Sequence, residues 1–172
     1  HKGFMSSTGK CFDIGNTTRN ALAKFSSSGH KQVRCGSSDK RKAGNGSLMR
    51  LAPVPMFYTF TSWELVGKMS REQSVSTHLA PQCLEACRYY GILIRAALLG
   101  NCTLEELLDK DFLAQEYFSS HPIKDEDVHQ VITNQTFKKK SSKGIVASGY
   151  VVKSLEAALW ALYNCNNDFK TG

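Results

Sequence analysis

The sequence has no long hydrophobic segment and no paired-cysteine motif. No apolar run reaches the roughly 18 residues that a membrane span requires, and no basic segment followed by an apolar one opens the chain as in a secretory signal. The six cysteines are spread along the chain without any Cys-x-x-Cys spacing, which argues against a zinc site. These features favour a cytoplasmic protein with reduced thiols and no membrane association.

Four Asn-x-Ser/Thr tripeptides support a different location. They begin at Asn16, Asn45, Asn101 and Asn134, and such tripeptides accept glycans in the secretory pathway. A sugar on Asn45 would place a bulky group inside the glycine-flanked stretch GNG (44–46). We therefore expect the cytoplasm rather than the secretory pathway.

Acidic residues are fewer than basic ones, with 15 Asp and Glu against 22 Lys and Arg, and the formal net charge is +7. The excess is concentrated in DKRK (39–42) and FKKKSSK (137–143). Ser and Gly surround both runs, so solvated loops are one interpretation and attraction of a phosphate or polyanion is the other. Aromatic residues do not alternate with these lysines as they do on surfaces that stack single strands, so nucleic acid is not an expected partner.

Hydrophobic periodicity predicts helices and no strand. We expect a helix over 13–25 with Asp13 as a plausible N-cap, one from Ser47 to 58 that its prolines bend or end, and one over 61–78 with Ser62 as its cap.

The clearest predicted helix runs from Pro81, which suits a first turn, to Gly100, which suits a helix end. A short helix over 103–108 and a polar stretch around 125–127 lead to a last helix over 151–162. The inner face of the long helix is predicted to carry Leu84, Cys87, Gly91, Ile94 and Leu98. The 172 residues, 41% of them apolar, thus predict one all-α domain.

The stretch GNG precedes Ser47, where a helix is predicted to begin. A helix start leaves backbone N–H groups unpaired, and glycines let a phosphate approach them without side-chain obstruction. Arg50 could reinforce such a contact. The alternative is an ordinary loop with a glycine turn and an asparagine cap.

Four segments, in this order, resemble successive core motifs of the ADP-ribosylglycohydrolase family. They are FDIGNTTRNAL (12–22), GNGSLMRLAPV (44–54), STHLAP (76–81) and SGYVVKSLEAALWAL (148–162). The resemblance implies a compact orthogonal helical bundle. It also implies hydrolysis of the bond between ADP-ribose and a modified side chain or small molecule, with two bound magnesium ions.

The resemblance also implies which residues bind ADP-ribose or the ADP-ribosylated protein. His78 would donate to a phosphate or ribose oxygen, although a lone histidine before a helix also suits a cap or a surface group. Tyr150 would pack near the adenosine or, alternatively, in the core. The cleft around the ribose and diphosphate would be lined by Gly44, Asn45, Gly46, Ser47 and Met49.

Asp13 is the catalytic residue that the resemblance implies. Its carboxylate would face the scissile ribose and activate water or stabilise developing positive charge. On the sequence alone, a helix N-cap explains this aspartate equally well.

The acidic motifs that hold magnesium in the family are absent from this sequence, which has no Asp-Asp pair. Its Asp-x-Asp spacings, Asp109 with Asp111 and Asp125 with Asp127, lie in polar surface stretches and are not expected to bind magnesium. The sequence therefore resembles the central portion of a catalytic domain, truncated at both ends, whose metal ligands lie elsewhere.

Two classes of function follow. One is a hydrolase whose isolated portion retains the ADP-ribose cleft without activity, and the other is a non-catalytic ADP-ribose-binding or structural protein on the same scaffold. Arginine, serine and ester linkages are all compatible with these motifs, because loops outside them recognise the leaving group.

Overall fold

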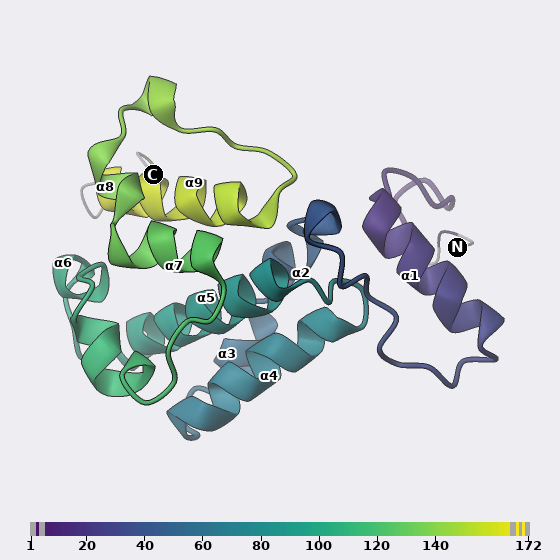
Figure 1. Ribbon diagram of the computed structural model, residues 1–172, viewed down its shortest axis with the longest axis horizontal. Coiled ribbons are helices and arrows are strands. Elements are labelled where there is room, and N and C mark those ends of the chain that lie inside the picture. Colours follow the sequence, from purple (N-terminus) through teal and green to yellow (C-terminus); the bar gives the residue numbers. More distant parts are fainter. Residues whose placement is uncertain (1–2, 4–5, 166–167, 169, 171–172) are drawn as a thin grey trace.

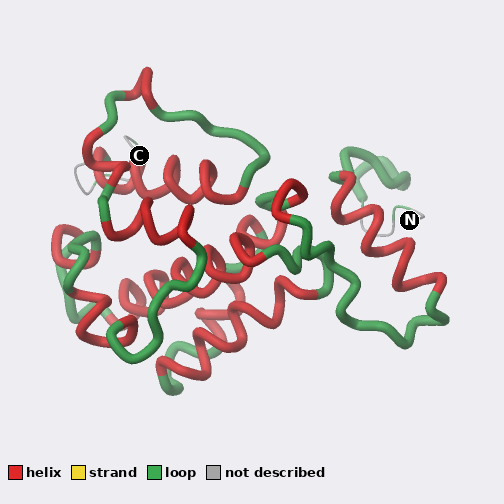
Figure 2. The backbone as a smooth tube through the Cα atoms, in the orientation of Figure 1, coloured by secondary structure: helices red, strands yellow, loops and turns green. Residues whose placement is uncertain are grey.

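The computed structural model describes residue 3, residues 6–165, and residues 168 and 170, and within this part of the chain it consists of helices joined by loops, without a strand (Figure 2). The all-α prediction is confirmed. The α-helices are α1 (Asn16–Ser27), α2 (Gly46–Met49), α3 (Pro53–Phe57), α4 (Trp63–Val75), α5 (Pro81–Leu99), α6 (Leu104–Leu107), α7 (Glu126–Thr133), α8 (Thr136–Lys139) and α9 (Val151–Asn164). Short elements of other helix types are η1 (Lys40–Lys42), η2 (Ala114–Phe118) and η3 (Ser142–Gly144).

Helix α5 lies at the centre of the bundle and contacts α2, α3, α4, α6, α7 and α9 (Figure 1). Pro81 occupies its first turn and Gly100 ends it with φ of 68°, as predicted. Although α5 is the longest helix, neither it nor another helix of the described residues is long and apolar enough to cross a membrane.

The predicted inner face of α5 is only partly correct. Cys87 and Gly91 are buried, whereas Leu98 is 49% exposed. Because α5 has neighbours on several sides, burial extends around it to Ile92 and even to Arg88, so one helical stripe does not describe its contacts.

One predicted helix start differs from the structure, and one helix was not predicted. Helix α1 begins at Asn16 with Gly15 as its N-cap, and Asp13 lies in a turn with φ of 48° instead of capping the helix. Asp125 caps an unpredicted helix, α7, and accepts the N–H of Val128 at 3.2 Å. Both differences arise because cap residues are common in turns as well as at helix starts.

The prolines divide the predicted 47–58 helix into α2 and α3, and α2 begins at Gly46 rather than Ser47. The predicted cap of α4 is confirmed, because the Ser62 hydroxyl accepts the N–H of Leu65 at 3.2 Å.

Helix α1 lies apart from the rest of the bundle, and residues 28–45, which include η1, connect it to α2 (Figure 1). Its N-terminal end faces the start of α2, so two segments carrying predicted site residues lie opposite one another.

Candidate functional site

The loop that carries GNG is held against the start of α9. The N–H of Asn45 donates to the carbonyl of Gly149 at 2.9 Å, and the N–H of Val151 donates to the carbonyl of Ala43 at 3.0 Å. The Asn45 side-chain amide also donates to the Ser154 hydroxyl at 2.8 Å. These bonds join segments about one hundred residues apart in sequence, so the loop is fixed before any ligand binds.

His78 packs directly behind the same loop. A Cβ atom built on Gly44 would lie 3.3 Å from Nε2 of His78, and one built on Gly46 would lie 2.9 Å from Cε1 and 3.2 Å from Nε2. The two glycines therefore make room for the imidazole, and its Nε2 atom faces the loop.

A cavity of about 410 Å³ lies between this loop and the start of α1. It gathers most of the predicted site residues, including the proposed catalytic aspartate. Its lining consists of Asp13, Gly15, Asn16, Thr17, Thr18, Gly44, Asn45, Gly46, Met49, His78 and Gly149. Its volume falls within the range of about 300–1,000 Å³ that small-molecule sites occupy.

The side chains of Ser47 and Tyr150 do not line this cavity. Ser47 is fully buried, and its hydroxyl accepts a hydrogen bond from Ser74 at 2.8 Å. Tyr150 is half-buried, and its hydroxyl donates to Asp127 at 3.0 Å.

Unpaired backbone donors line the cavity from two directions. Among the described residues, the N–H groups of Asn16, Thr17 and Thr18 in the first turn of α1 have no hydrogen-bond partner, and neither has that of Gly46. By contrast, the N–H of Gly44 is already bonded to Lys42. The donors of α1 were not predicted, although NTT directly after Gly15 was a signal of an uncapped helix start.

The imidazole of His78 is only 3% exposed. Burial lowers its pKa to about 4, and the nearby Arg50 guanidinium adds to this shift. His78 is therefore neutral at pH 7 and presents a hydrogen-bonding group without charge.

Asp13 approaches the cavity from a strained turn. Its φ of 48° lies in the left-handed region, which aspartate tolerates better than most residues. Asp13 is exposed and lines the cavity together with Gly46.

A neighbouring cavity of about 220 Å³ shares Thr17, Gly44 and Gly149 with the first one. Tyr150 lines it together with Arg41 and Lys42 of the first basic run. The two cavities thus form a continuous surface on which an elongated ligand could contact both backbone donors and cations.

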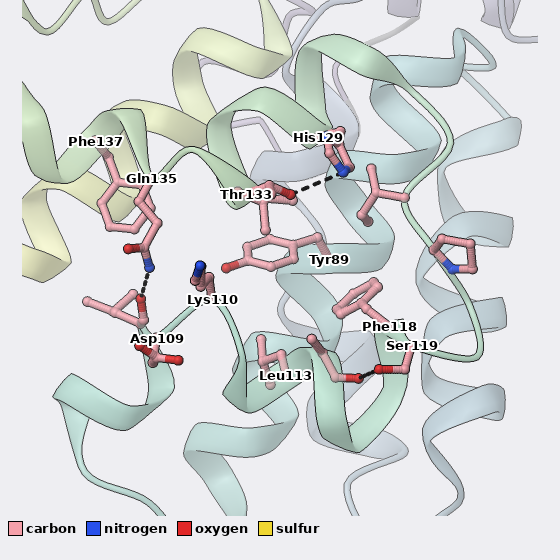
Figure 3. A pocket seen from close by; sticks show the side chains of 15 residues that line it. Tyr89, Asp109, Lys110, Leu113, Phe118, Ser119, His129, Thr133, Gln135 and Phe137 are labelled. Carbon is pink, nitrogen blue, oxygen red and sulfur yellow. Dashed lines mark hydrogen bonds between the residues drawn. The ribbon is translucent and has the colours of Figure 1, made fainter.

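A third cavity, of about 190 Å³, lies between α5, η2 and α7 (Figure 3). Its walls are largely apolar, with Leu113, Phe118 and Phe137 around the buried ring of Tyr89. None of the predicted site residues lines it.

The Asp-x-Asp pairs do not fit a metal ion. Asp125 caps α7, Asp127 accepts the Tyr150 hydroxyl, and Asp109 accepts the N–H of Asp111 at 2.8 Å. Across the part of the chain that the structure describes, no three His, Cys, Asp or Glu side chains are grouped so that they could hold a metal.

Comparison with known proteins identifies the family of the chain. The family model of ADP-ribosylglycohydrolase matches residues 1–172, and the chain belongs to that family. It is 33% identical over 165 residues to the ADP-ribosylarginine hydrolase Tri1 of Serratia proteamaculans (strain 568). It is 38% identical over 169 residues to the protein of the same name from Pseudomonas putida (strain GB-1). Each alignment covers 96% of this chain but 41% of the relative, so the chain spans less than half of their length.

Proposed function

We propose that this chain forms the ADP-ribose-binding part of a hydrolase that cleaves the glycosidic bond between ADP-ribose and an arginine side chain. The observation that carries the proposal is the 410 Å³ cavity, in which Asp13, the GNG loop and His78 meet the start of α1. The names of the two relatives support arginine as the modified residue.

The diphosphate is proposed to lie between the first turn of α1 and the loop at Gly46. The free N–H groups there are donors that a phosphate accepts, and the twelve-residue α1 adds the partial positive charge of a helix start. The adenosine is proposed to extend toward Tyr150 in the neighbouring cavity, with Arg41 and Lys42 at its edge.

The proposed chemical role of Asp13 is to activate water or to stabilise positive charge on the ribose as the glycosidic bond breaks. His78, neutral at pH 7, would donate to an oxygen of the ligand. Ser47 is proposed to anchor the loop to α4 in the protein interior, since its hydroxyl accepts a hydrogen bond from Ser74.

Magnesium is the proposed cofactor of the complete enzyme. Because the described residues do not fit the ion, its carboxylate ligands are proposed to come from the part of the relatives' length that this chain does not span. The cytoplasm is the proposed location, and the free thiols of Cys35, Cys83 and Cys87 support it.

Titration calorimetry with ADP-ribose tests the site. Gly46→Val should abolish binding, because even its Cβ atom would crowd His78 at 2.9 Å and the larger side chain would cover the backbone donors. Gly144→Val is the matched control, since a Cβ there has its nearest neighbour at 3.7 Å and lies outside the cavity. Equal affinities of the two variants would refute the proposed site.

A further inference from the structure

The side chain of Arg50 points away from the proposed phosphate position and holds the end of α4. Its Nε atom donates to Oε1 of Gln73 at 3.0 Å, and Nη2 donates to the Gln73 carbonyl at 2.7 Å and the Ser76 hydroxyl at 3.3 Å. The remaining nitrogen, Nη1, donates to the hydroxyl oxygen of Thr77 at 2.7 Å. All three guanidinium nitrogens are therefore engaged within the protein.

The same Thr77 hydroxyl oxygen lies 2.8 Å from Nδ1 of His78. A guanidinium can only donate, so Thr77 must accept from Arg50, and its single O–H hydrogen is then directed to another acceptor. Nδ1 of His78 is the only other side-chain atom of the described residues bonded to this hydroxyl. The arrangement satisfies both groups when the hydroxyl donates to Nδ1.

A neutral imidazole carries one hydrogen, so a ring that accepts at Nδ1 must carry its hydrogen on Nε2. Nε2 is the atom that faces Gly44 and Gly46 at the cavity. The opposite tautomer would direct two donors at Thr77, which is 7% exposed, and would present a lone pair to the oxygens of a ligand.

We propose that Arg50 is a positioning residue that acts through the hydroxyl of Thr77 to fix His78 with its hydrogen on Nε2, so that His78 offers a donor to ligand oxygen atoms. The inference deepens the proposed function and rests on it for the identity of the ligand. The tautomer itself is a property of the protein without ligand.

We call the hydrogen-bonded chain of Arg50, Thr77 and His78 the relay. Its function explains why Arg50 directly follows α2, the helix that begins within GNG. Helix α2 ends at Met49, and Arg50 is its C-cap residue, so one short helix carries both the loop in front of His78 and the guanidinium behind it. Gln73 strengthens this coupling, because its amide nitrogen donates to the carbonyl of Ser47 at 3.1 Å while its oxygen accepts from Arg50.

Long-range ¹H–¹⁵N correlation spectra of the ¹⁵N-labelled chain at pH 7 test the proposal directly. The chain contains five histidines, and His78→Gln identifies the signals of His78. The wild-type protein without ligand should show Nδ1 as an unprotonated, hydrogen-bonded nitrogen and Nε2 as a protonated one. A hydrogen on Nδ1 would overturn the proposal, whatever the outcome for any variant.

Two substitutions at Thr77 separate the relay from a merely structural role. Thr77→Val removes the hydroxyl at nearly constant shape and should yield a mixture of tautomers, whereas Thr77→Ser should retain the wild-type spectrum. Arg50→Lys should also yield a mixture, because an ammonium cannot reproduce the fork that holds both Gln73 and Thr77. Unchanged nitrogen shifts of His78 in Thr77→Val and Arg50→Lys would overturn the relay.

Titration calorimetry with ADP-ribose on the same samples tests whether the tautomer of His78 affects ligand affinity. Thr77→Val should weaken ADP-ribose binding by about threefold to tenfold relative to Thr77→Ser, which is the loss expected for one neutral hydrogen bond. If the wild-type chain shows the Nε2–H tautomer but does not bind ADP-ribose, the proposed function fails while the assignment of the relay stands. Equal affinities of the valine and serine variants would refute the step from tautomer to ligand.

Discussion

Gly91 of α5 lies so close to Ser70 of α4 that a Cβ atom at position 91 would stand 2.1 Å from the Ser70 hydroxyl oxygen and 2.8 Å from its Cβ. Both residues are buried, so neither helix can move aside without disturbing the core. Gly91 therefore sets the separation of α4 and α5, which are joined by the segment that carries His78.

Gly91→Ala should destabilise the chain by about 1–3 kcal/mol, which is typical of an overpacked core. The measurement is urea unfolding followed by circular dichroism. Ser70→Gly should restore part of the loss in the double variant, and Gly144→Ala should change little, because its Cβ meets its first neighbour at 3.7 Å. A Gly91→Ala variant as stable as wild type would show that α4 and α5 separate freely.

Removal of the buried guanidinium of Arg88 should cost about 3–5 kcal/mol of stability, because the substitution leaves a buried carboxylate without its main partner. Arg88 is 4% exposed and Glu85 is 2% exposed, and Nη2 of Arg88 lies 2.5 Å from Oε2 of Glu85. The guanidinium also donates to the carbonyls of His121 and Pro122, at 2.6 and 2.7 Å, and so ties η2 to α5.

Thermal unfolding of Arg88→Met measures this loss, with Arg41→Met as the control. The side chain of Arg41 is 90% exposed, so solvent screens its ion pair with Asp39 and the substitution should change stability little. Similar unfolding temperatures for the two variants would contradict the importance of the buried pair.

Stability should fall as the pH is lowered from 6.5 to 4, because His78 must remain neutral in the folded chain. Its pKa is about 4 when folded against a reference value of 6.5, so the unfolded chain binds more protons within this window. The contribution of His78 to the free energy of unfolding is therefore fully present above about pH 6.5 and is lost as the pH falls toward 4.

The free energy of unfolding, measured against pH for wild type and His78→Gln, isolates this contribution from carboxylates that titrate at similar pH. The variant should show a smaller decrease between pH 6.5 and pH 4. Parallel curves would mean that His78 is accessible to protons in the folded state.

The parts of the fold that the sequence predicted are those fixed by local backbone chemistry. Ser62, Pro81 and Gly100 mark helix ends through a side-chain acceptor, a missing N–H and a left-handed φ, and none of these depends on distant residues. Helix α7 was missed because Asp125 and its acidic neighbours resemble a solvated loop, although Val128 and Val131 on the same helix are buried.

The candidate site was predictable only to the extent that its residues form contiguous motifs. The GNG loop was visible as a pattern, but Gly149 reaches the cavity through its pairing with Asn45, and Thr17 reaches it through the position of α1, and a linear sequence shows neither. The inward direction of Ser47 depends on Ser74 of α4, and so it too required the packed structure.

Asp13 should be dispensable for binding and important for turnover. Asp13 lines the cavity, and in the proposed function it acts on the ribose while the backbone donors of α1 and Gly46 hold the diphosphate. Asp13→Asn keeps the shape and hydrogen-bonding capacity of the side chain but removes the base. The expected loss of turnover is on the order of 10²–10⁴, the usual contribution of one acid–base group, with ADP-ribose affinity close to that of wild type.

A chimera provides the complete domain for this measurement. Residues 1–172 replace the aligned region of the Pseudomonas putida hydrolase, to which they are 38% identical, and release of ADP-ribose from an ADP-ribosylarginine peptide is followed with magnesium. Asp111→Asn, at an exposed aspartate outside the cavity, is the control and should leave turnover unchanged. Full turnover in Asp13→Asn would remove this residue from the chemistry. A chimera that binds ADP-ribose without releasing it, even with Asp13 intact, would favour a non-catalytic, ADP-ribose-binding role for the chain.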